Sequence, residues 1–563
     1  MKISHWLILA LLLNCITQAN GQSLPVGTPI LEDSYRRGQI LGKIDSTISF
    51  TIRPINLTNG ISIEDVYYPD FSNTSNLKKE NQTASGKRKK VFRLLPVTIQ
   101  LQSNTDHPVG FNDGAMIPAR GFQQMLSAGF YAKIGRLNIQ LKPEYVYASN
   151  KEFQQFYAEQ GDQEWYEYSE LYNFIDLPER FGLKPYNRLF WGQSSISLTF
   201  NPISIGISNE NLWWGPSIRN SLLMSNNAPG FKHISINTVR PIKTKMGSFE
   251  SQIIMGRLEN SGILPPDTSR RYIGYKLYIP KREEWRCLTA AILTYQPKWI
   301  PGLFLGYNQG ISMYGKDLGP LLGDIFTSLN PFGSGYKHGW EISNVPTEHR
   351  SSLFFRWLMQ RSHAEFYAEY GREYRAYNTR DLMLQFEYSR AFIIGFRKLY
   401  QIKRNPGQQI QIELELTQLE QTNTNPEKLA RYWYSSREVR QGYTHQGQVL
   451  GAGIGPGSNL ESISVSWVKS LKLIGFQVER FVHNNDLHNI AIKDIRGNWV
   501  DLCLSVRCDW NHRNFLVSSK FGMVKSFNYE DYYRPTYKND QLFWTPGIDV
   551  YNFHGSLNLS YRF

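Results

Sequence analysis

Residues 551–563, with the sequence YNFHGSLNLSYRF, end the chain in a strict two-residue alternation. Every second residue from Tyr551 to the terminal Phe563 is aromatic, apolar or glycine, and the intervening residues are polar. Successive side chains of a strand point to opposite faces, so this segment has one apolar and one polar face. A soluble sandwich also alternates, but it seldom ends on an aromatic residue. The pattern therefore favours the closing strand of a membrane barrel, where every backbone amide must be paired within a closed sheet.

The same alternation recurs from about residue 91 onwards. Clear examples are residues 137–142, 195–207, 410–417, 463–467 and 500–507. Asn201-Pro202 is a turn signal, so the flanking runs are predicted to form a hairpin. The apolar faces are short, as tilted barrel strands require, and the other faces carry Glu, Arg, Gln and Ser, which suits a polar lumen. Several sandwich domains would need linkers, and none is visible. We predict one all-β, antiparallel transmembrane barrel.

Composition narrows the class of protein. The 563 residues are 41% hydrophobic and 14% aromatic, with a mean hydropathy of −0.41 and a formal charge of +14. No run outside the N-terminus approaches the ~18 apolar residues of a membrane helix. These values exclude a helical membrane protein and a disordered chain, but they are compatible with strands that are apolar on one face only.

The chain divides into three predicted regions. Residues 1–21 have the anatomy of a cleaved signal peptide, and its removal with Lys2 lowers the charge to +13. Residues 22–90 are predicted to be a periplasmic helical and loop region, with a loose helical pattern at 31–44 and a polar, basic loop at 72–90. Residues 91–563 are predicted to form the barrel with long extracellular loops.

Motifs for catalysis, cofactors and metals are missing. The mature chain has three cysteines, Cys287, Cys503 and Cys508, in no disulfide or zinc pattern. We find no GxSxG, HExxH or phosphate-binding glycine loop. The sequence therefore indicates a protein that is not an enzyme, without metal or cofactor, and with no nucleic-acid partner.

Two loop regions are candidates for binding a glycan. Residues 151–174 place Trp165, Tyr166 and Tyr168 among carboxylates; aromatic rings suit the C–H faces of sugars, and carboxylates accept hydrogen bonds from hydroxyl groups. The alternative is that these rings pack the loop onto the barrel. The second region, residues 211–230, supplies the remaining candidates: Trp213, Trp214, Arg219, Asn226 and Asn227. The tryptophans could instead be structural and the asparagines could cap turns.

A polar network is expected in the lumen. His363, Glu365, Tyr367 and Glu369 recur at every second residue, opposite Ala364, Phe366, Ala368 and Tyr370. Arginines at 356, 361 or 372 could pair with them, and buried ion pairs of this kind hold filled barrels together.

The order of several motifs resembles the capsule assembly Wzi family, in the longer form found in Bacteroidetes-type bacteria. The likeness covers nearly all of the mature chain. The motifs are PVGFNDG (108–114), DLPERFG (176–182), WGQSS (191–195), NLWWGP (211–216), NSLLMSNNAPG (220–230), GRLE (256–259), FYAEYG (366–371), AFIIGFRK (391–398) and YTHQGQVLGAGIGPGS (443–458).

The resemblance implies an outer-membrane barrel of about eighteen strands with a short N-terminal helical element. It also implies a lectin-like role in binding and retaining capsular or extracellular polysaccharide. The charge of +13 favours an acidic glycan, with membrane lipid and lipopolysaccharide phosphates as further partners. The terminal strand ending in Phe563 resembles the signal read by the outer-membrane assembly machinery. The alternatives are a polysaccharide or solute channel and an accessory barrel of a gliding-motility or secretion complex.

Overall fold

The computed structural model describes residues 23–56, 66–69, 90–318, 346–374, 379–405, 407–421, 432–532 and 547–563. The predicted signal peptide and nearly all of the basic loop 72–90 lie outside the described residues.

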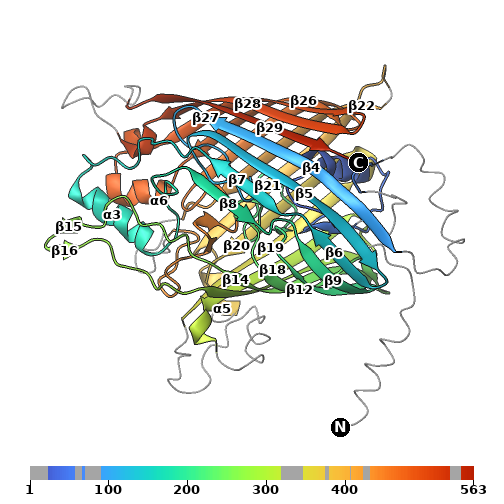
Figure 1. The fold of residues 1–563 in the computed structure, drawn as a ribbon, viewed down its shortest axis with the longest axis horizontal. Coiled ribbons are helices and arrows are strands. Elements are labelled where there is room, and N and C mark those ends of the chain that lie inside the picture. Colours follow the sequence, from blue (N-terminus) through green and yellow to red (C-terminus); the bar gives the residue numbers. More distant parts are fainter. Residues whose placement is uncertain are drawn as a thin grey trace, which may run out of the picture.

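The chain forms a closed antiparallel barrel (Figure 1). Its segments are β4 (Val91–Asn104), β5 (Gly121–Ile134), β6 (Leu137–Leu141), β7 (Glu144–Ala148), β8 (Tyr186–Phe190), β9 (Ser195–Phe200), β10 (Ile203–Ser208), β12 (His233–Thr238), β13 (Ile242–Lys243), β14 (Gly247–Leu258), β17 (Arg286–Pro297), β18 (Leu303–Tyr314), β19 (Thr347–Met359), β20 (Ala364–Arg372), β21 (Arg390–Gln401), β22 (Gln408–Gln418), β25 (Asn459–Lys469), β26 (Lys472–Val482), β27 (Val500–His512), β28 (Phe515–Phe527) and β29 (Val550–Tyr561). The last strand, β29, pairs with the first, β4, and so closes the sheet.

The barrel has eighteen strands, although twenty-one segments make it up. Three strands are interrupted: β6 and β7 both pair with β5, β12 and β13 both pair with β14, and β8 and β9 continue one another beside β7 and β6. The hairpin predicted around Asn201-Pro202 is confirmed by the pairing of β9 with β10. The predicted fold class is confirmed as a whole.

The two ends of the barrel differ. Turns of a few residues join the strands at one end, for example Ser470-Leu471 between β25 and β26. Long loops, such as residues 149–185 and 209–232, join them at the other. We call these the short-turn end and the long-loop end. In Figure 1 the C-terminus lies at the short-turn end on the right, and α3 (Asp162–Asn173) lies at the long-loop end on the left.

The side chains alternate across the wall as the sequence pattern predicts. Outward residues such as Phe476 and Phe521 are half-exposed or more, whereas inward residues such as Glu365 and Gln411 are fully buried. The apolar outer face matches what a membrane barrel requires. Among the described residues, no helix is both long and apolar enough to cross a membrane.

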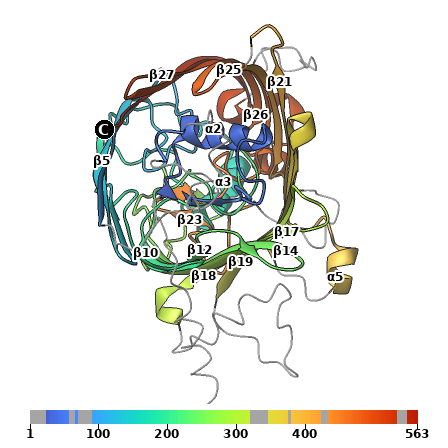
Figure 2. The same ribbon diagram turned by 90° about the vertical axis from the view of Figure 1, so that its right-hand side faces the viewer.

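Chain segments fill the lumen (Figure 2). From the short-turn end come β1 (Ser23–Leu24), α2 (Pro29–Ile40), β2 (Ile52–Arg53) and β3 (Ile55–Asn56). From the long-loop end come β11 (Trp213–Trp214), β23 (Thr444–His445) and β24 (Gln448–Val449). The long loops contain β15 (Arg271–Tyr272), β16 (Tyr275–Lys276), α5 (Thr379–Leu384), α6 (Asn485–Leu487) and single helical turns at Gly315–Asp317, His488–Ile492, Ile495–Gly497 and Tyr529–Asp531. One further helical turn, Gln360–Ser362, lies at the short-turn end.

Candidate functional site

Helix α2 is fixed to the barrel wall by four alternating charges. Asp33 and Arg36 are three residues apart on α2 and so share a face. Opposite them, Glu365 of β20 and Arg397 of β21 are cross-strand partners. Arg36 Nε lies 2.7 Å from Glu365 Oε1, and Arg397 Nη2 lies 2.7 Å from Asp33 Oδ1. The helix and the wall therefore present matched charge pairs to each other.

The wall adds further charges to this group. Arg356 of β19 donates its Nε to Glu365 Oε2 at 2.8 Å, and Arg397 Nε lies 3.8 Å from Glu365 Oε1. With Arg36, one carboxylate therefore serves three guanidinium groups. Burial alone would raise the pKa of Asp33, but the nearby guanidinium groups of Arg397 and Arg37 outweigh it and hold the pKa of that carboxyl well below its usual range. The carboxylate form of Asp33 is therefore the one that docks α2.

Three of the four residues predicted for a lumen network do lie in the lumen: Glu365, Tyr367 and Glu369. Tyr367 donates its hydroxyl to Glu415 Oε2 at 2.8 Å, and Glu369 is almost fully buried. His363 lies elsewhere. It precedes β20 in a short turn, with a left-handed backbone (φ 46°), because the strand begins only at the next residue.

Segments from the two ends of the barrel meet inside it. Loop 209–232 turns inward, and its strand β11 pairs with β2 of the N-terminal segment. The partners are Trp213 with Arg53 and Trp214 with Ile52. Trp214 N also donates to Met224 O at 3.0 Å. The plug is thus continuous from the short-turn end to the long-loop end.

Both tryptophans of the WWGP motif belong to this plug. Trp214 is completely buried and donates its indole N–H to Gln252 Oε1 of β14 at 2.8 Å. Trp213 is 4% exposed, and the Arg53 guanidinium lies 4.7 Å from its ring centroid. Neither ring reaches the outer surface.

Arg219, Asn226 and Asn227 are also occupied by protein partners. Arg219 donates its Nε to Glu479 Oε1 of β26 at 2.8 Å. Asn226 and Asn227 donate their side-chain amides to backbone carbonyl oxygens of other loops at 2.8 and 3.0 Å. These contacts join separate loops to one another and to the wall. The two asparagines therefore bridge distant loops here, whereas the alternative predicted for them from sequence was the capping of turns.

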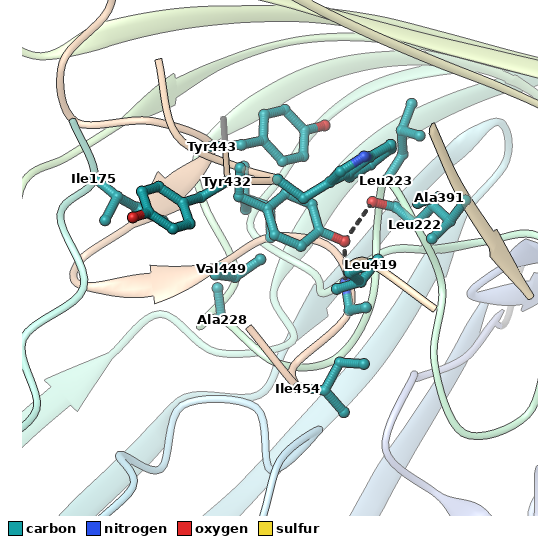
Figure 3. Close-up of a cluster of buried hydrophobic side chains, with 14 of the residues drawn as sticks. Ile175, Leu222, Leu223, Ala228, Ala391, Leu419, Tyr432, Tyr443, Val449 and Ile454 are labelled. Carbon is teal, nitrogen blue, oxygen red and sulfur yellow. Dashed lines mark hydrogen bonds between the residues drawn. The ribbon is translucent and has the colours of Figure 1, made fainter. Parts of the chain in front are cut away.

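A second inward loop, residues 432–458, packs against the first (Figure 3). Tyr434 donates its hydroxyl to Leu222 O at 2.9 Å and accepts a hydrogen bond from the backbone N–H of Ala452 at 2.7 Å. Its ring stacks with that of Tyr443, over which Arg350 of β19 lies at 4.7 Å. The long-loop half of the lumen is therefore a packed core.

Helix α3 closes the long-loop end from outside. Trp165 and Tyr168 are both 3% exposed and pack on Phe156 with ring centroids 5.1 and 4.3 Å away. Tyr166, on another face of α3, is partly exposed, and its ring centroid lies 5.9 Å from that of Tyr272 of β15. The loop 151–174 is partly helical, as predicted, and only Tyr166 of its three candidate aromatics borders the exposed hairpin.

That hairpin, β15–β16, projects at the long-loop end (Figure 1). Tyr275 is 79% exposed and Ile273, in its turn, 76%. Arg271 and Lys276 are exposed as well, and within the described part of the chain neither forms an ion pair. Arg271 and Lys276 are cross-strand partners and share one face of the hairpin, whereas Tyr272 and Tyr275 share the other. The hairpin therefore exposes an aromatic ring on one face and two cations on the other, groups that can contact sugar rings and acidic substituents.

A comparison with known protein families finds one that matches the chain. The sequence profile described as "Capsule assembly protein Wzi" matches residues 94–510. The chain belongs to the Wzi capsule assembly family. Among curated proteins, none matches this family member by sequence.

The solved structure of Escherichia coli Wzi has the same fold. The match covers 97% of this chain and all of the Escherichia coli Wzi chain, with a TM-score of 0.58 and 13% sequence identity. That protein is described as an outer membrane, carbohydrate-binding β-barrel involved in group 1 capsule assembly. The match to Pseudomonas aeruginosa OccK7 covers 84% of this chain and 99% of that one, with 8% identity and a TM-score of 0.37. The match to Acinetobacter baumannii OccAB4 covers 86% of this chain and 99% of that one, with 10% identity and a TM-score of 0.37.

A cavity of about 370 Å³ remains in the lumen of this Wzi family member, beside the plug. Its wall comprises β22, β25–β29 and β4, where many inward side chains are small, such as Ser462, Ser464 and Gly522. Trp213, Arg219 and Asn226 line it from the plug side. Three of the glycan-binding candidates, together with Tyr367 of the predicted lumen network, thus line one internal space.

Sequence reasoning missed the docking face of α2. The available signal was Asp33 followed three residues later by Arg36 in a segment with a helical pattern. Such a pair reads equally well as a solvated helix face, because its partners, Glu365 and Arg397, are more than 300 residues away.

Proposed function

We propose that this Wzi family member is a non-enzymatic outer-membrane protein that binds and retains capsular or other extracellular polysaccharide at the cell surface. Membership of the family carries the proposal, and the solved relative is described as carbohydrate-binding. Bacterial barrels place short turns in the periplasm and long loops outside. On that rule, the N-terminal region 22–90 lies on the periplasmic side and the long-loop end faces the polymer. We further propose that residues 1–21 are a leader that is cleaved on export.

The continuous plug supports binding over conduction. Polypeptide from both ends meets at β2 and β11, and the packed core around Tyr434 fills the long-loop half. Among the described residues, this plug obstructs the passage of a polymer chain unless the plug moves. We therefore assign polymer contact to the outer loops.

The exposed hairpin β15–β16 is the best-placed contact. Tyr275 offers an apolar ring face, and Arg271 and Lys276 offer unpaired cations to carboxylates or sulfates of an acidic glycan. Lipopolysaccharide phosphates are a further partner for the same cations. The terminal Phe563 is proposed to serve recognition by the outer-membrane assembly machinery.

The test is polymer retention in a deletion strain. Cell-bound and released polysaccharide are measured in the deletion strain and after complementation. We expect the deletion strain to make polymer but shed it, and the wild-type gene to restore retention.

Variants locate the contact. Tyr275→Ala with Lys276→Ala should fail to restore retention, whereas Leu183→Ala with Lys184→Ala should restore it. The control also removes one large apolar side chain and one lysine from an exposed long loop, since Leu183 is 86% exposed. If cell-bound polymer is unchanged in the deletion strain, retention is not the function. Single-channel conductance and co-purifying proteins would then test the channel and accessory-barrel alternatives.

A further inference from the structure

The cavity beside the plug is long and of ligand size. Along β27 it extends from Asp501 to Arg507, six residues or about 20 Å of strand. Its volume of about 370 Å³ falls in the range of small-molecule sites, roughly 300–1,000 Å³. The space follows from residue choice, because Ser466, Gly475 and Ser518 occupy inward positions where larger side chains would fill it.

Charge in the cavity is internally compensated. Six cations line it, and each has a carboxylate partner: Arg36 with Glu365, Arg53 with Glu32, Arg219 and Lys520 with Glu479, Arg397 with Asp33, and Arg507 with Asp509. An anionic ligand would have to break one of these pairs, and the lining carboxyl of Asp113 already accepts a hydrogen bond from Gln102 Nε2 at 3.2 Å. The chemistry of the site therefore favours an uncharged ligand.

Neutral polar groups on the wall are available. Gln100 of β4, Ser466 of β25, and Ser556 and Asn558 of β29 all line the cavity. In the described part of the chain, none of these four side chains makes a hydrogen bond. Asn558 is the cross-strand partner of Gln100, so these two amides lie side by side with Ser556 two residues along. Serine and amide side chains each both donate and accept, as sugar hydroxyl groups do.

We propose that this lumenal cavity binds a short, uncharged saccharide inside the barrel, at a site separate from the outer hairpin. Gln100, Ser556 and Asn558 hydrogen-bond its hydroxyl groups, and Trp213 lines the opposite side. The site is distinct from polymer retention, so either can fail without the other.

The experiment uses the purified full-length barrel in detergent. Binding of maltose, lactose and cellobiose is measured by calorimetry across the millimolar range. Cys503 lines the cavity and is a free thiol, so its alkylation by N-ethylmaleimide, followed by mass spectrometry, reports occupancy of the cavity. We expect at least one disaccharide to bind and to slow alkylation several-fold.

Three variants decide where binding occurs. Ser556→Phe should place a ring over the amides of Gln100 and Asn558 and abolish binding. Asn558→Leu should weaken it at least tenfold while keeping the volume of the side chain. Ser519→Phe introduces the same ring on the neighbouring strand at a position facing outward, and should bind like the wild type. Heat-modifiable mobility in electrophoresis verifies that each barrel is folded.

Two results overturn the proposal. One is the absence of binding for all three disaccharides, which means that the cavity holds water only. The other is binding that Ser556→Phe and Asn558→Leu leave unchanged, which places the sugar on the outer loops. Polymer retention by cells carrying Ser556→Phe is scored separately: if it persists while disaccharide binding is lost, the cavity site stands apart from retention.

Discussion

Replacing Glu365 with glutamine should release helix α2 from the barrel wall. The carboxylate of Glu365 has no exposed surface and accepts from Arg36 at 2.7 Å and from Arg356 at 2.8 Å. Glutamine keeps the shape and one acceptor oxygen but loses the charge. Two buried guanidinium groups then face each other without their anion.

The magnitude follows from the number of pairs broken. Removing one partner of a buried ion pair costs about 3–5 kcal/mol, because the other charge stays buried. The remaining carbonyl oxygen still accepts one hydrogen bond, which favours the lower end, about 3 kcal/mol. Since 1.4 kcal/mol is a factor of ten, the equilibrium for undocking α2 should rise by about a hundredfold.

Hydrogen exchange of the α2 amides measures this equilibrium. Exchange of residues 31–40 in the folded barrel should accelerate by about two orders of magnitude in Glu365→Gln. The matched control is Glu413→Gln. Glu413 also contacts Arg397, but it is 20% exposed and Arg397 keeps Asp33, so we expect a change of less than about 1 kcal/mol.

Equal protection of α2 in the wild type and both variants would refute the ionic argument. The helix would then be held by its apolar end, where Ile40 packs with Phe304, Leu358 and Leu399. A loss of protection throughout the barrel would instead show that Glu365 stabilises the wall itself.

Three further predictions concern the plug. Trp214→Phe leaves the Gln252 carbonyl without its donor and should lower the free energy of unfolding by about 1–3 kcal/mol, measured from the midpoint of denaturation in detergent. Asp113 lies in the loop between β4 and β5 and lines the cavity beside the plug. Burial raises its pKa to about 6, so the folded state holds its proton more tightly than the unfolded chain does. Stability should therefore fall as the pH rises from about 4 to 6, and Asp113→Asn should flatten that dependence in denaturation measured at pH 4, 5, 6 and 7. The pH dependence expected from Asp33 has the opposite sign, because its pKa is lower in the folded state than in the unfolded chain. Protection of α2 in hydrogen exchange should therefore be intact at neutral pH and decline below about pH 4.

The strands could be predicted from sequence because their signal is local. Alternation within 551–563 or 195–207 depends only on the two faces of one strand, and the structure has β29, β9 and β10 there. The resemblance of ordered motifs then supplied the strand number. Neither step required knowledge of contacts between distant residues.

The arrangement of the lumen could not be predicted in this way. Trp214 is buried where it hydrogen-bonds to Gln252 of β14 and to Met224 of the same inward loop. The sequence of the WWGP motif alone does not indicate these partners. His363 continues the period of β20 in sequence, but its left-handed backbone ends the pattern one residue early. The alternating serines at 462, 464 and 466 were visible, yet alternation alone does not tell whether a serine faces packed protein or empty space.

The inward side chains differ between two parts of the barrel wall. Large buried arginines on β17, β19 and β21, namely Arg286, Arg350, Arg356 and Arg397, anchor inward segments from both ends. On β25–β29 many inward positions hold small side chains, such as Ser464 and Gly522, beside the paired charges of Glu479, Arg507 and Lys520. Outward positions there include large side chains such as Phe476 and Phe521. Barrel curvature cannot explain this difference, because the strands run continuously around one closed sheet. The space beside the plug is therefore a property of the sequence, and the same wall that leaves it open also supplies the unpaired hydroxyl and amide groups that a sugar could bind.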